Sequence, residues 1–358
     1  MSSTRLRIAV VFGGRSSEHS ISCISASGVM SALDPEKYEV LAIGITTEGR
    51  WVIVDSALDF SLSGSTLPKV PDVGECAALS PDPVQVLHQL GHIDVVFPVL
   101  HGPWGEDGTV QGLLELAGLP YVGSGVLASA AGMDKVTMKV LLAHAGLPVG
   151  AFIGITNRQW DADPSACLAR AAALGLPAFV KPARAGSSRG ISKVKALAEL
   201  SDAIEDARTH DPRVIVEAAV AAGREIECGV LVLADAQVSA SRCAEIVVGG
   251  AHEFYDFDAK YLEDSAELIV PAPLEPAVEA QIQALAIDAF EALGCEGLAR
   301  VDFFIGADGE VLINEVNTMP GFTPISMFPR MWQASGVSYS EVLDALIADA
   351  LRRGTGLR

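Results

Sequence analysis

The chain opens with a β-strand pattern, a glycine turn and a helix pattern in immediate succession. An apolar run of strand character covers residues 6–12, Gly13-Gly14 follows it, and a helical pattern runs from residue 20 to 33. This order is typical of a parallel α/β unit, in which each strand is followed by a helix that packs back on the sheet. A second strand pattern at 93–100, leading into His101-Gly102, predicts another strand of this kind.

The segment between these strands differs in composition. Residues 55–83 are rich in serine, proline, glycine and acidic side chains and show no apolar period. Such a segment is typical of an irregular surface insertion, and we expect no functional residue in it.

Gly-Leu-Pro punctuates the next part of the chain, at 118–120, 146–148 and 175–177, each time after a helical pattern. Glycine can supply the left-handed residue that ends a helix, and proline prevents the helix from continuing. Beyond residue 134 the pattern predicts helix, strand, helix, a strand at 178–181 and a glycine loop. The last third predicts strands near 214–217 and 225–233, a long helix at 275–293, a hairpin and two terminal helices.

Charge and composition exclude several classes of function. The 45 acidic residues outnumber the 25 basic ones, and the net charge of −20 would repel nucleic acid and anionic membranes. Apolar runs are interrupted before they reach the roughly 18 residues that a membrane helix requires, and the start shows no signal-peptide pattern, so we expect a cytoplasmic protein without membrane insertion. The six cysteines form no CxxC pair and are expected to be buried thiols.

A predicted hairpin near the C-terminus carries the strongest chemical signal. Asp308-Gly309 favours a two-residue type I′ turn, in which both residues have positive φ. With that turn, Asp302 lies directly across from Glu315, and Arg300 across from Asn317. Two carboxylates at this spacing repel each other unless a cation lies between them, and carboxylate and amide oxygens suit Mg²⁺. The alternative is a solvated acidic edge, which the apolar neighbours of these residues disfavour.

A metal with phosphates calls for basic groups, and Lys181 supplies one at the end of an apolar strand. The loop that follows it, residues 184–190, is rich in small residues that let backbone N–H groups approach an anion. No GxxxxGK[ST] motif occurs, which removes the P-loop interpretation. Residues 123–128 fit GxGxx[GA], but no acidic residue occurs between 135 and 160 to hold a ribose, so dinucleotide binding is a weaker alternative.

Seven motifs in order resemble the D-alanine:D-alanine ligase family of ATP-grasp enzymes, across essentially the whole chain outside 55–83. They are GGRSSE (13–18), HGPWGEDG (101–108), GSG (123–125) with MDK (133–135), KPARAGSS (181–188), YDFDAKY (255–261), RVD (300–302) and EVNTMPG (315–321). The resemblance implies an α/β (α+β) protein with a three-domain ATP-grasp fold. Its domains would be an N-terminal parallel α/β domain (1–123), a central domain (124–217) and a C-terminal domain (218–358), with ATP between the last two.

The resemblance also implies roles for individual residues. The nucleotide would be bound by Lys135 and Lys181 at its phosphates, by Glu217 at adenine, by Glu225 at the ribose, and by Ser187, Val220, Lys260 and Asn314. Two Mg²⁺ ions, or Mn²⁺, would be bound by Asp302, Glu315 and Asn317. The substrates would be bound by Glu18 and His101 (first D-alanine) and by Ser326 (second D-alanine). Catalysis would fall to Arg300 and the Gly321 N–H at the oxyanion, Lys260 at the transferred phosphate, and Ser187 and Tyr261, which link to Glu18.

Several of these residues have simpler interpretations when taken alone. Glu18 is equally consistent with a helix-capping carboxylate, His101 with a satisfied core histidine, and Ser326 with a helix cap. The glycine loop departs from the common family pattern at Ala183, Ala185 and Arg189, and the hinge departs from it at 218–222. These departures affect nucleotide affinity and loop dynamics rather than the reaction.

Residues 249–265 combine glycine, aromatic and acidic residues and suggest a mobile lid that carries Lys260 and Tyr261. The resemblance further implies a homodimer that uses ATP and D-alanine to make a peptidoglycan precursor. Two alternatives stay open: a related ATP-grasp enzyme that joins a different pair of substrates, and a non-catalytic nucleotide-binding or NAD-binding module.

Overall fold

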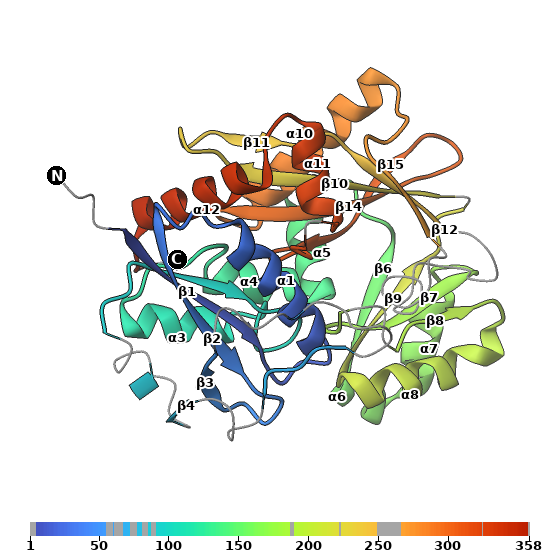
Figure 1. Cartoon of the computed structure of the whole chain (residues 1–358). Helices are drawn as coiled ribbons and strands as arrows, with labels where there is room; N and C mark the ends of the chain where they lie inside the picture. The colour runs from blue at the N-terminus through green and yellow to red at the C-terminus, as the bar shows by residue number, and fades with distance from the viewer. Residues whose placement is uncertain are drawn as a thin grey trace.

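The computed structural model describes residues 5–54, 60, 67–71, 77–80, 85–86, 91–186, 190–221, 223–248, 266–323 and 325–356. Within these residues the strands form three separate sheets, which follow one another along the chain. Figure 1 shows the first sheet in blue to teal, the second in green to yellow-green and the third in yellow to orange-red.

The first sheet has a parallel centre. Its strand order is β4-β3-β2-β1-β5, with β1 paired in parallel to both β2 and β5, while β3 and β4 are antiparallel additions. The strands are β1 (Leu6–Gly13), β2 (Tyr38–Ile45), β3 (Trp51–Ile53), β4 (Ala77–Ser80) and β5 (Val95–Val99). The helices of this part are α1 (His19–Ala32), α3 (Thr109–Ala117) and α4 (Val126–Met133). The predicted strand, glycine turn and helix are therefore confirmed, and Gly13 and Gly14 both have positive φ.

The second sheet is antiparallel, in the order β6-β9-β7-β8. Its strands are β6 (Phe152–Thr156), β7 (Ala178–Pro182), β8 (Ser192–Val194) and β9 (Arg213–Ala218). The helical segments here are α5 (Lys135–His144), α6 (Asn157–Ala162), α7 (Pro164–Ala172), η1 (Leu197–Glu199) and α8 (Leu200–His210). Helices α7 and α8 share one core with this sheet, and Figure 1 shows all three together in the green lobe at the lower right.

The third sheet is also antiparallel, in the order β13-β12-β10-β14-β15, with β11 paired to β10. Its strands are β10 (Arg224–Val232), β11 (Val238–Ala240), β12 (Ala244–Val248), β13 (Ala266–Ile269), β14 (Leu298–Ile305) and β15 (Val311–Asn317). The helices are α10 (Pro276–Ala292), α11 (Met327–Ala334) and α12 (Tyr339–Arg353). Val301 and Phe303 pack in one core with α10. By the two-residue period of a strand, Arg300 and Asp302 point to the opposite face.

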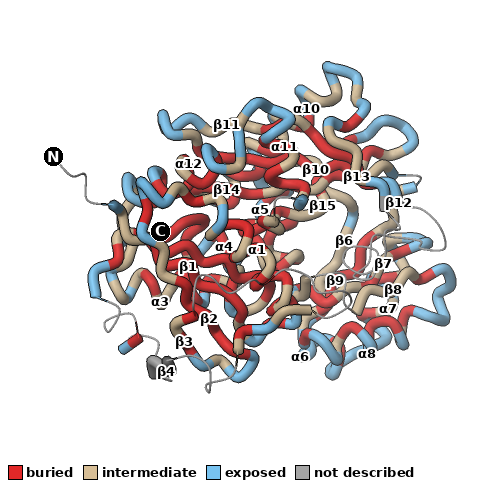
Figure 2. Tube along the Cα trace, viewed as in Figure 1, coloured by how far each residue is buried: buried red, intermediate tan, exposed pale blue. Residues whose placement is uncertain are grey.

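The C-terminal helices connect the third part of the chain to the first. Phe328 of α11 and Leu346 of α12 belong to the same buried core as Ile8 and Phe97 of the first sheet. Figure 2 shows the buried part of the trace continuing between these two regions. Met319 and Phe322, in the loop between β15 and α11, belong to the same core, so this loop is held by packing against both regions.

The predicted helix stops are also confirmed. Gly118, Gly146 and Gly175 all have positive φ just after α3, α5 and α7. The five cysteines in the described residues are buried free thiols, as expected. No helix in the described part of the chain is long and apolar enough to span a membrane.

Candidate active site

One cavity of about 780 Å³ gathers the predicted site residues. Its lining includes all of those that the structure describes: Glu18, His101, Lys135, Lys181, Glu217, Val220, Glu225, Arg300, Asp302, Asn314, Glu315, Asn317, Gly321 and Ser326. They come from the second and third sheets, from α5, and from loops that include those following β1 and β5 of the first sheet. Ser187, Lys260 and Tyr261, the whole predicted lid (249–265) and Arg189 lie outside the described residues.

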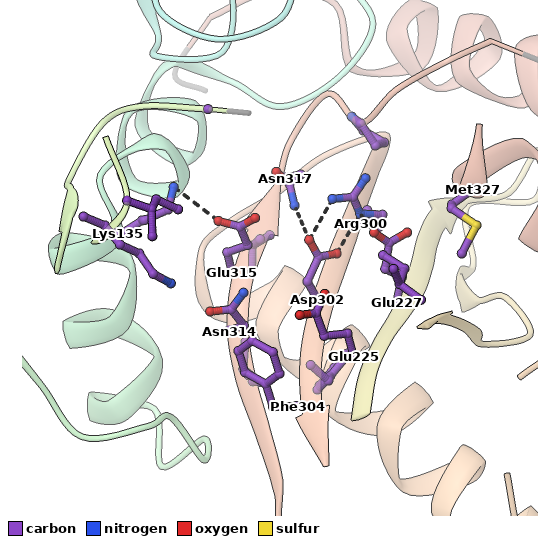
Figure 3. A pocket seen from close by; sticks show the side chains of 18 of the residues that line it. Lys135, Glu225, Glu227, Arg300, Asp302, Phe304, Asn314, Glu315, Asn317 and Met327 are labelled. Carbon is purple, nitrogen blue, oxygen red and sulfur yellow. Dashed lines mark hydrogen bonds and ion pairs between the residues drawn. The ribbon is translucent and has the colours of Figure 1, made fainter. Parts of the chain in front are cut away.

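The β14–β15 hairpin brings the predicted carboxylates together. Asp302 pairs with Glu315 across the two strands, and Arg300 pairs with Asn317. Arg300 donates from Nε and Nη2 to the two oxygens of Asp302 at 2.6 and 2.7 Å, and Asn317 Nδ2 donates to Asp302 at 3.0 Å (Figure 3). Burial opposes the charge of Arg300, but Asp302 and then Glu227 outweigh this effect and raise the pKa of Arg300 well above its usual value.

The turn that we predicted for this hairpin is wrong, although the pairing is right. Among the described residues Gly309 has positive φ and Asp308 does not, so the type I′ turn is absent. The chain instead closes a longer loop, in which the Gly309 N–H donates to Gly306 O and the Gly306 N–H donates to Glu310 O, both at 2.9 Å. A bulge then inserts Asn314 as an extra residue, because Phe303 pairs with Ile313 while Asp302 pairs with Glu315. The bulge restores the pairing that the longer loop had shifted by one residue.

Glu315 has its own cation partner from the second part of the chain. Lys135, the first residue of α5, lies with Nζ 3.2 Å from Glu315 Oε2 and also donates to Ala185 O at 3.1 Å. Burial disfavours the Lys135 ammonium, but the Glu315 carboxylate outweighs burial and raises the pKa of Lys135. Asp134 fixes the start of α5 because its side chain accepts a hydrogen bond from the Thr137 N–H.

A second ion cluster lines the same cavity and joins α5, β7 and β9. Glu217 accepts from Lys139 Nζ at 2.8 Å through one oxygen and from Lys181 Nζ at 2.7 Å through the other. Burial alone would raise the pKa of Glu217, but Lys181 and Lys139 outweigh it and lower the pKa to about 2. We did not predict Lys139 as a site residue from the sequence. A signal existed, because Lys139 follows Lys135 by four residues and therefore shares its side of α5.

Glu18 lies where three glycine-containing loops converge. It occupies the N-cap position of α1, but its carboxylate makes no capping hydrogen bond to that helix, so the capping alternative is not supported. A Cβ atom built on Gly102 would lie 2.4 Å from Glu18 Oε2, and one built on Gly186 would lie 2.6 Å from it. The Glu18 carboxylate therefore reaches the loops that follow β5 and β7.

His101 is buried, and both of its ring nitrogens have partners. Nδ1 lies 3.1 Å from Met319 O, and Nε2 lies 3.0 Å from Ser25 Oγ. Burial lowers the pKa of His101, so the neutral ring is favoured. This is the satisfied histidine of the simpler interpretation, yet it also lines the cavity and holds the backbone just before Gly321.

Glu106 holds the same backbone through a second contact, a role that we did not predict from the sequence. Its carboxylate accepts from the Gly102 N–H at 2.6 Å and from the Met319 N–H at 3.2 Å. Burial, together with the nearby charge of Glu18, raises the pKa of Glu106 to about 8. His101 and Glu106 thus fix the loop between β15 and α11 through both polar groups of Met319.

That loop carries the remaining predicted residues. A Cβ atom built on Gly321 would lie 3.2 Å from Ser326 Oγ, so the two residues are neighbours. Ser326 occupies the N-cap position of α11 but makes no capping hydrogen bond to that helix. Its hydroxyl instead accepts from the Thr323 N–H at 3.1 Å and lies 2.7 Å from Thr323 Oγ1.

The donor set of the hairpin fits a divalent metal ion. Asp302 and Glu315 are opposed carboxylates, and Asn317 adds an amide oxygen, all of them hard ligands. Among the described residues no three His, Cys, Asp or Glu side chains cluster as a complete metal site. The protein therefore offers a partial set, as expected for Mg²⁺ that takes its other ligands from substrate phosphates.

The second and third sheets are both antiparallel and both border the cavity, which is lined by lysines and opposed carboxylates. This arrangement defines the ATP-grasp class of enzymes, and α1 and the loops beside the parallel N-terminal sheet line the rest of the cavity. Comparison with known proteins gives the family. Residues 7–124 match the family model described as D-ala D-ala ligase N-terminus, and residues 141–348 match D-ala D-ala ligase C-terminus. The chain belongs to the D-alanine:D-alanine ligase family.

Individual relatives cover the whole chain. A D-alanine–D-alanine ligase of Rhodococcus opacus is 55% identical over 100% of both chains, and one of Kineococcus radiotolerans is 53% identical over 98% of each. Among solved structures, the D-alanine-D-alanine ligase of Coxiella burnetii aligns with a TM-score of 0.79 and 35% identity, over 98% of this chain and 95% of that one. A D-Ala:D-Ser ligase of Enterococcus faecalis aligns with a TM-score of 0.81 and 37% identity, over 97% of this chain and 100% of that one.

Proposed function

We propose that this protein joins two molecules of D-alanine to D-alanyl-D-alanine at the expense of ATP, as a step in making peptidoglycan precursors. The observation that carries the proposal is the single cavity in which Glu18 and His101, Lys135 and Lys181, and the Arg300–Asp302 hairpin meet. The full-length identity of 53 to 55% with proteins named D-alanine–D-alanine ligase supports the same activity.

The reaction has two steps. A carboxylate oxygen of the first D-alanine attacks the γ-phosphorus of ATP, the bond to the bridging oxygen breaks, and ADP leaves. The amine of the second D-alanine then attacks the carbonyl carbon of the acyl phosphate, loses a proton and displaces inorganic phosphate. Negative charge develops on the phosphoryl group in the first step and on the carbonyl oxygen in the second, so positioned cations and N–H donors dominate catalysis.

On the substrate side of the cavity, each residue is assigned to the substrate group whose charge or hydrogen-bonding capacity it matches. Glu18, backed by His101, binds the ammonium of the first D-alanine, and Ser326 binds the carboxylate of the second. Arg300 and the Gly321 N–H stabilise the oxyanion, while Lys260 binds the transferred phosphate. Ser187 and Tyr261 complete this side by hydrogen bonds to Glu18.

The nucleotide side lies between the second and third sheets. Lys135 and Lys181 bind the phosphates, Glu217 and Val220 contact adenine, Glu225 binds the ribose, and Asn314 lies at the bulge of β15. Asp302, Glu315 and Asn317 would hold two Mg²⁺ or Mn²⁺ ions, which neutralise phosphate charge when bound. Without the ions, Arg300 and Lys135 neutralise part of the hairpin charge.

The wider organisation belongs to the same proposal. The domains would be 1–123, 124–217 and 218–358, with one sheet in each except that Ala218 ends β9 of the second sheet, and the protein acts in the cytoplasm as a homodimer. Two exposed leucines support the dimer: Leu116 of α3 is 90% exposed and Leu127 of α4 is 71% exposed, on helices that pack against each other. Light scattering of Leu116→Asp, expected to be monomeric, tests this assignment.

A second candidate is a ligase whose acceptor is not D-alanine, since the Enterococcus faecalis structure is that of a D-Ala:D-Ser ligase. One competition experiment separates the two. The protein is incubated with ATP, Mg²⁺, D-alanine and either D-serine or D-lactate, with L-alanine as control, and the products are read by mass. D-alanyl-D-alanine as the main product supports the proposal, whereas a mixed product supports the second candidate, and no product at all contradicts both.

A further inference from the structure

A short segment from the predicted surface insertion reaches the cavity. Residues 67–71 are described by the structure, and Leu67 lines the same cavity as Glu18 and His101. Val70, three residues further on, is 5% exposed and belongs to the core of the first sheet. The expectation that the 55–83 insertion contributes nothing to the site is therefore wrong for this segment.

Two glycines make room for Val70. A Cβ atom built on Gly44 would lie 2.6 Å from Val70 Cγ1, and one built on Gly13 would lie 2.8 Å from Val70 Cγ2. Real Cβ contacts are not this short, so a larger residue at either position would displace Val70. Gly13 ends β1 and Gly44 lies in β2, so the segment docks onto the parallel centre of the first sheet.

His19 fixes the backbone of the docked segment. Its Nδ1 lies 2.7 Å from Gly14 O, which can only accept, so Nδ1 carries the proton. Nε2 of the neutral ring is then an acceptor, and the Val70 N–H donates to it at 3.1 Å. Burial lowers the pKa of His19, which favours this neutral form.

This anchor determines where Leu67 lies. Three extended residues cover at most about 10 Å, so Leu67 lies within that distance of the residue bound by His19. His19 itself directly follows Glu18. The cavity lining also includes Ile21 and Ile24 of α1, so three branched aliphatic side chains line the cavity that Glu18 lines.

We propose that Leu67 is a specificity-determining residue that bounds the pocket for the side chain of the first D-amino acid, with Ile21 and Ile24. His19 acts through the Val70 anchor as a positioning residue. The inference rests on the proposed ligase function, in which Glu18 binds the ammonium of that substrate. A methyl group is small and apolar, and an aliphatic wall held by a fixed anchor can exclude larger side chains.

The first experiment measures the size limit. Wild type, Leu67→Ala and the exposed control Leu197→Ala receive ATP, Mg²⁺ and an equimolar mixture of D-alanine and D-2-aminobutyrate. Tandem mass spectrometry identifies the N-terminal residue of each dipeptide. Because one methylene changes pocket discrimination by about 10-fold or more, Leu67→Ala should raise the share of N-terminal D-2-aminobutyrate by about that factor, while Leu197→Ala keeps the wild-type ratio.

The outcomes separate the two proposals. A wild-type ratio in Leu67→Ala, with normal dipeptide formation by wild type, overturns the assignment of Leu67 and leaves the ligase function standing. No dipeptide from wild type overturns the ligase function itself. A shift confined to the C-terminal residue of the dipeptide would assign Leu67 to the second substrate and also overturn the inference.

The second experiment tests the anchor. Trypsin can cut after the exposed Lys69, and the bond it would cut includes the Val70 nitrogen that His19 binds. His19→Phe keeps a ring but removes the acceptor, whereas His19→Gln restores an acceptor at a similar reach. We expect His19→Phe, and Val70→Ala as a second variant, to speed this cleavage and to raise the KM of the first D-alanine more than they lower kcat, with His19→Gln close to wild type. Wild-type cleavage and KM in both His19→Phe and Val70→Ala would overturn the positioning role.

Discussion

Two ion clusters line the cavity, and they differ in the balance of carboxylates and cations. On the second sheet and α5, Lys139 and Lys181 share the single carboxylate of Glu217, which leaves an excess of positive charge. On the third sheet, Arg300 pairs with Glu227 and Asp302, and Lys135 pairs with Glu315, so the described ion pairs of this negative cluster contain three carboxylates and two cations. The first cluster suits phosphate groups directly, whereas the second suits a divalent cation that bridges to them.

Two glutamates, Glu217 and Glu106, have pKa values that are shifted in opposite directions. Glu217 and Glu106 both line this cavity. Burial raises the pKa of each, but the two lysines overcome it at Glu217 and lower that pKa to about 2, while Glu106 has the charge of Glu18 nearby and its pKa rises to about 8. The partners of a buried carboxylate, more than burial itself, therefore determine its charge.

The largest effect should come from the negative cluster. Glu315→Gln removes one carboxylate from the opposed pair, and we expect kcat to fall by about 100-fold or more, because metal ions supply several kcal/mol of charge stabilisation. Turnover is measured over a range of Mg²⁺ concentrations, with removal of the metal by chelation expected to abolish activity in wild type. Glu310→Gln, in the exposed turn of the same hairpin, is the matched control and should behave as wild type. Unchanged turnover of Glu315→Gln would falsify the metal assignment.

The positive cluster should give the next largest effect. Lys181→Ala removes a phosphate partner from a largely buried site, where a charged hydrogen bond contributes about 1.5 to 3 kcal/mol. Nucleotide binding measured by calorimetry should weaken by roughly 10- to 150-fold. Lys195→Ala, an exposed lysine just past β8, should bind nucleotide as wild type does. Equal affinity of Lys181→Ala and wild type would mean that this cluster does not bind phosphate.

These clusters also show which parts of the site could be predicted from sequence. Asp302 and Glu315 were predicted to pair because strand period and a turn signal are local properties. The longer Gly306–Glu310 loop and the Asn314 bulge offset each other, and neither has a local signal that distinguishes it from the shorter turn.

The remaining contacts join residues far apart in the chain. The Lys139–Glu217 pair, the contact of Glu106 with the Met319 N–H and the docking of Val70 on His19 are decided by packing between elements. Of these residues, only Lys139 could have been predicted from helix periodicity, because it follows Lys135 by four residues. Leu67 lies in a segment whose apolar residues follow neither helix nor strand periodicity. The sequence therefore predicted the strand and helix order well, and the contacts between parts of the fold poorly.

A smaller effect should appear in the acid stability of the positive cluster. The pKa of Glu217 is lower in the folded protein, about 2, than its ordinary value of 4.5. Its ion pairs therefore stabilise the fold above pH 4.5, and this contribution is lost as pH falls toward 2. Lys139→Met removes one of the two lysines, so the pKa of Glu217 should rise and the acid-unfolding midpoint should move to higher pH. Circular dichroism during acid titration measures the midpoint, with Lys195→Met as control, and coincident midpoints for all three proteins would contradict the prediction.

Glu106 should show the opposite pH dependence, and the smallest effect. Its folded pKa of about 8 lies above the ordinary value of 4.5, so the folded state binds a proton that the unfolded state releases between these values. The stabilisation linked to Glu106 is thus complete below pH 4.5 and is lost as pH rises through about 8.

Glu106→Gln cannot titrate, so its free energy of unfolding should fall less between pH 5 and pH 8.5 than that of wild type. Urea denaturation at several pH values gives the two slopes, and Glu310→Gln shows how an exposed glutamate contributes. Parallel slopes for wild type and Glu106→Gln would mean that the N–H donors of Gly102 and Met319 keep Glu106 ionised. The two glutamates would then differ in their partners but not in their charge.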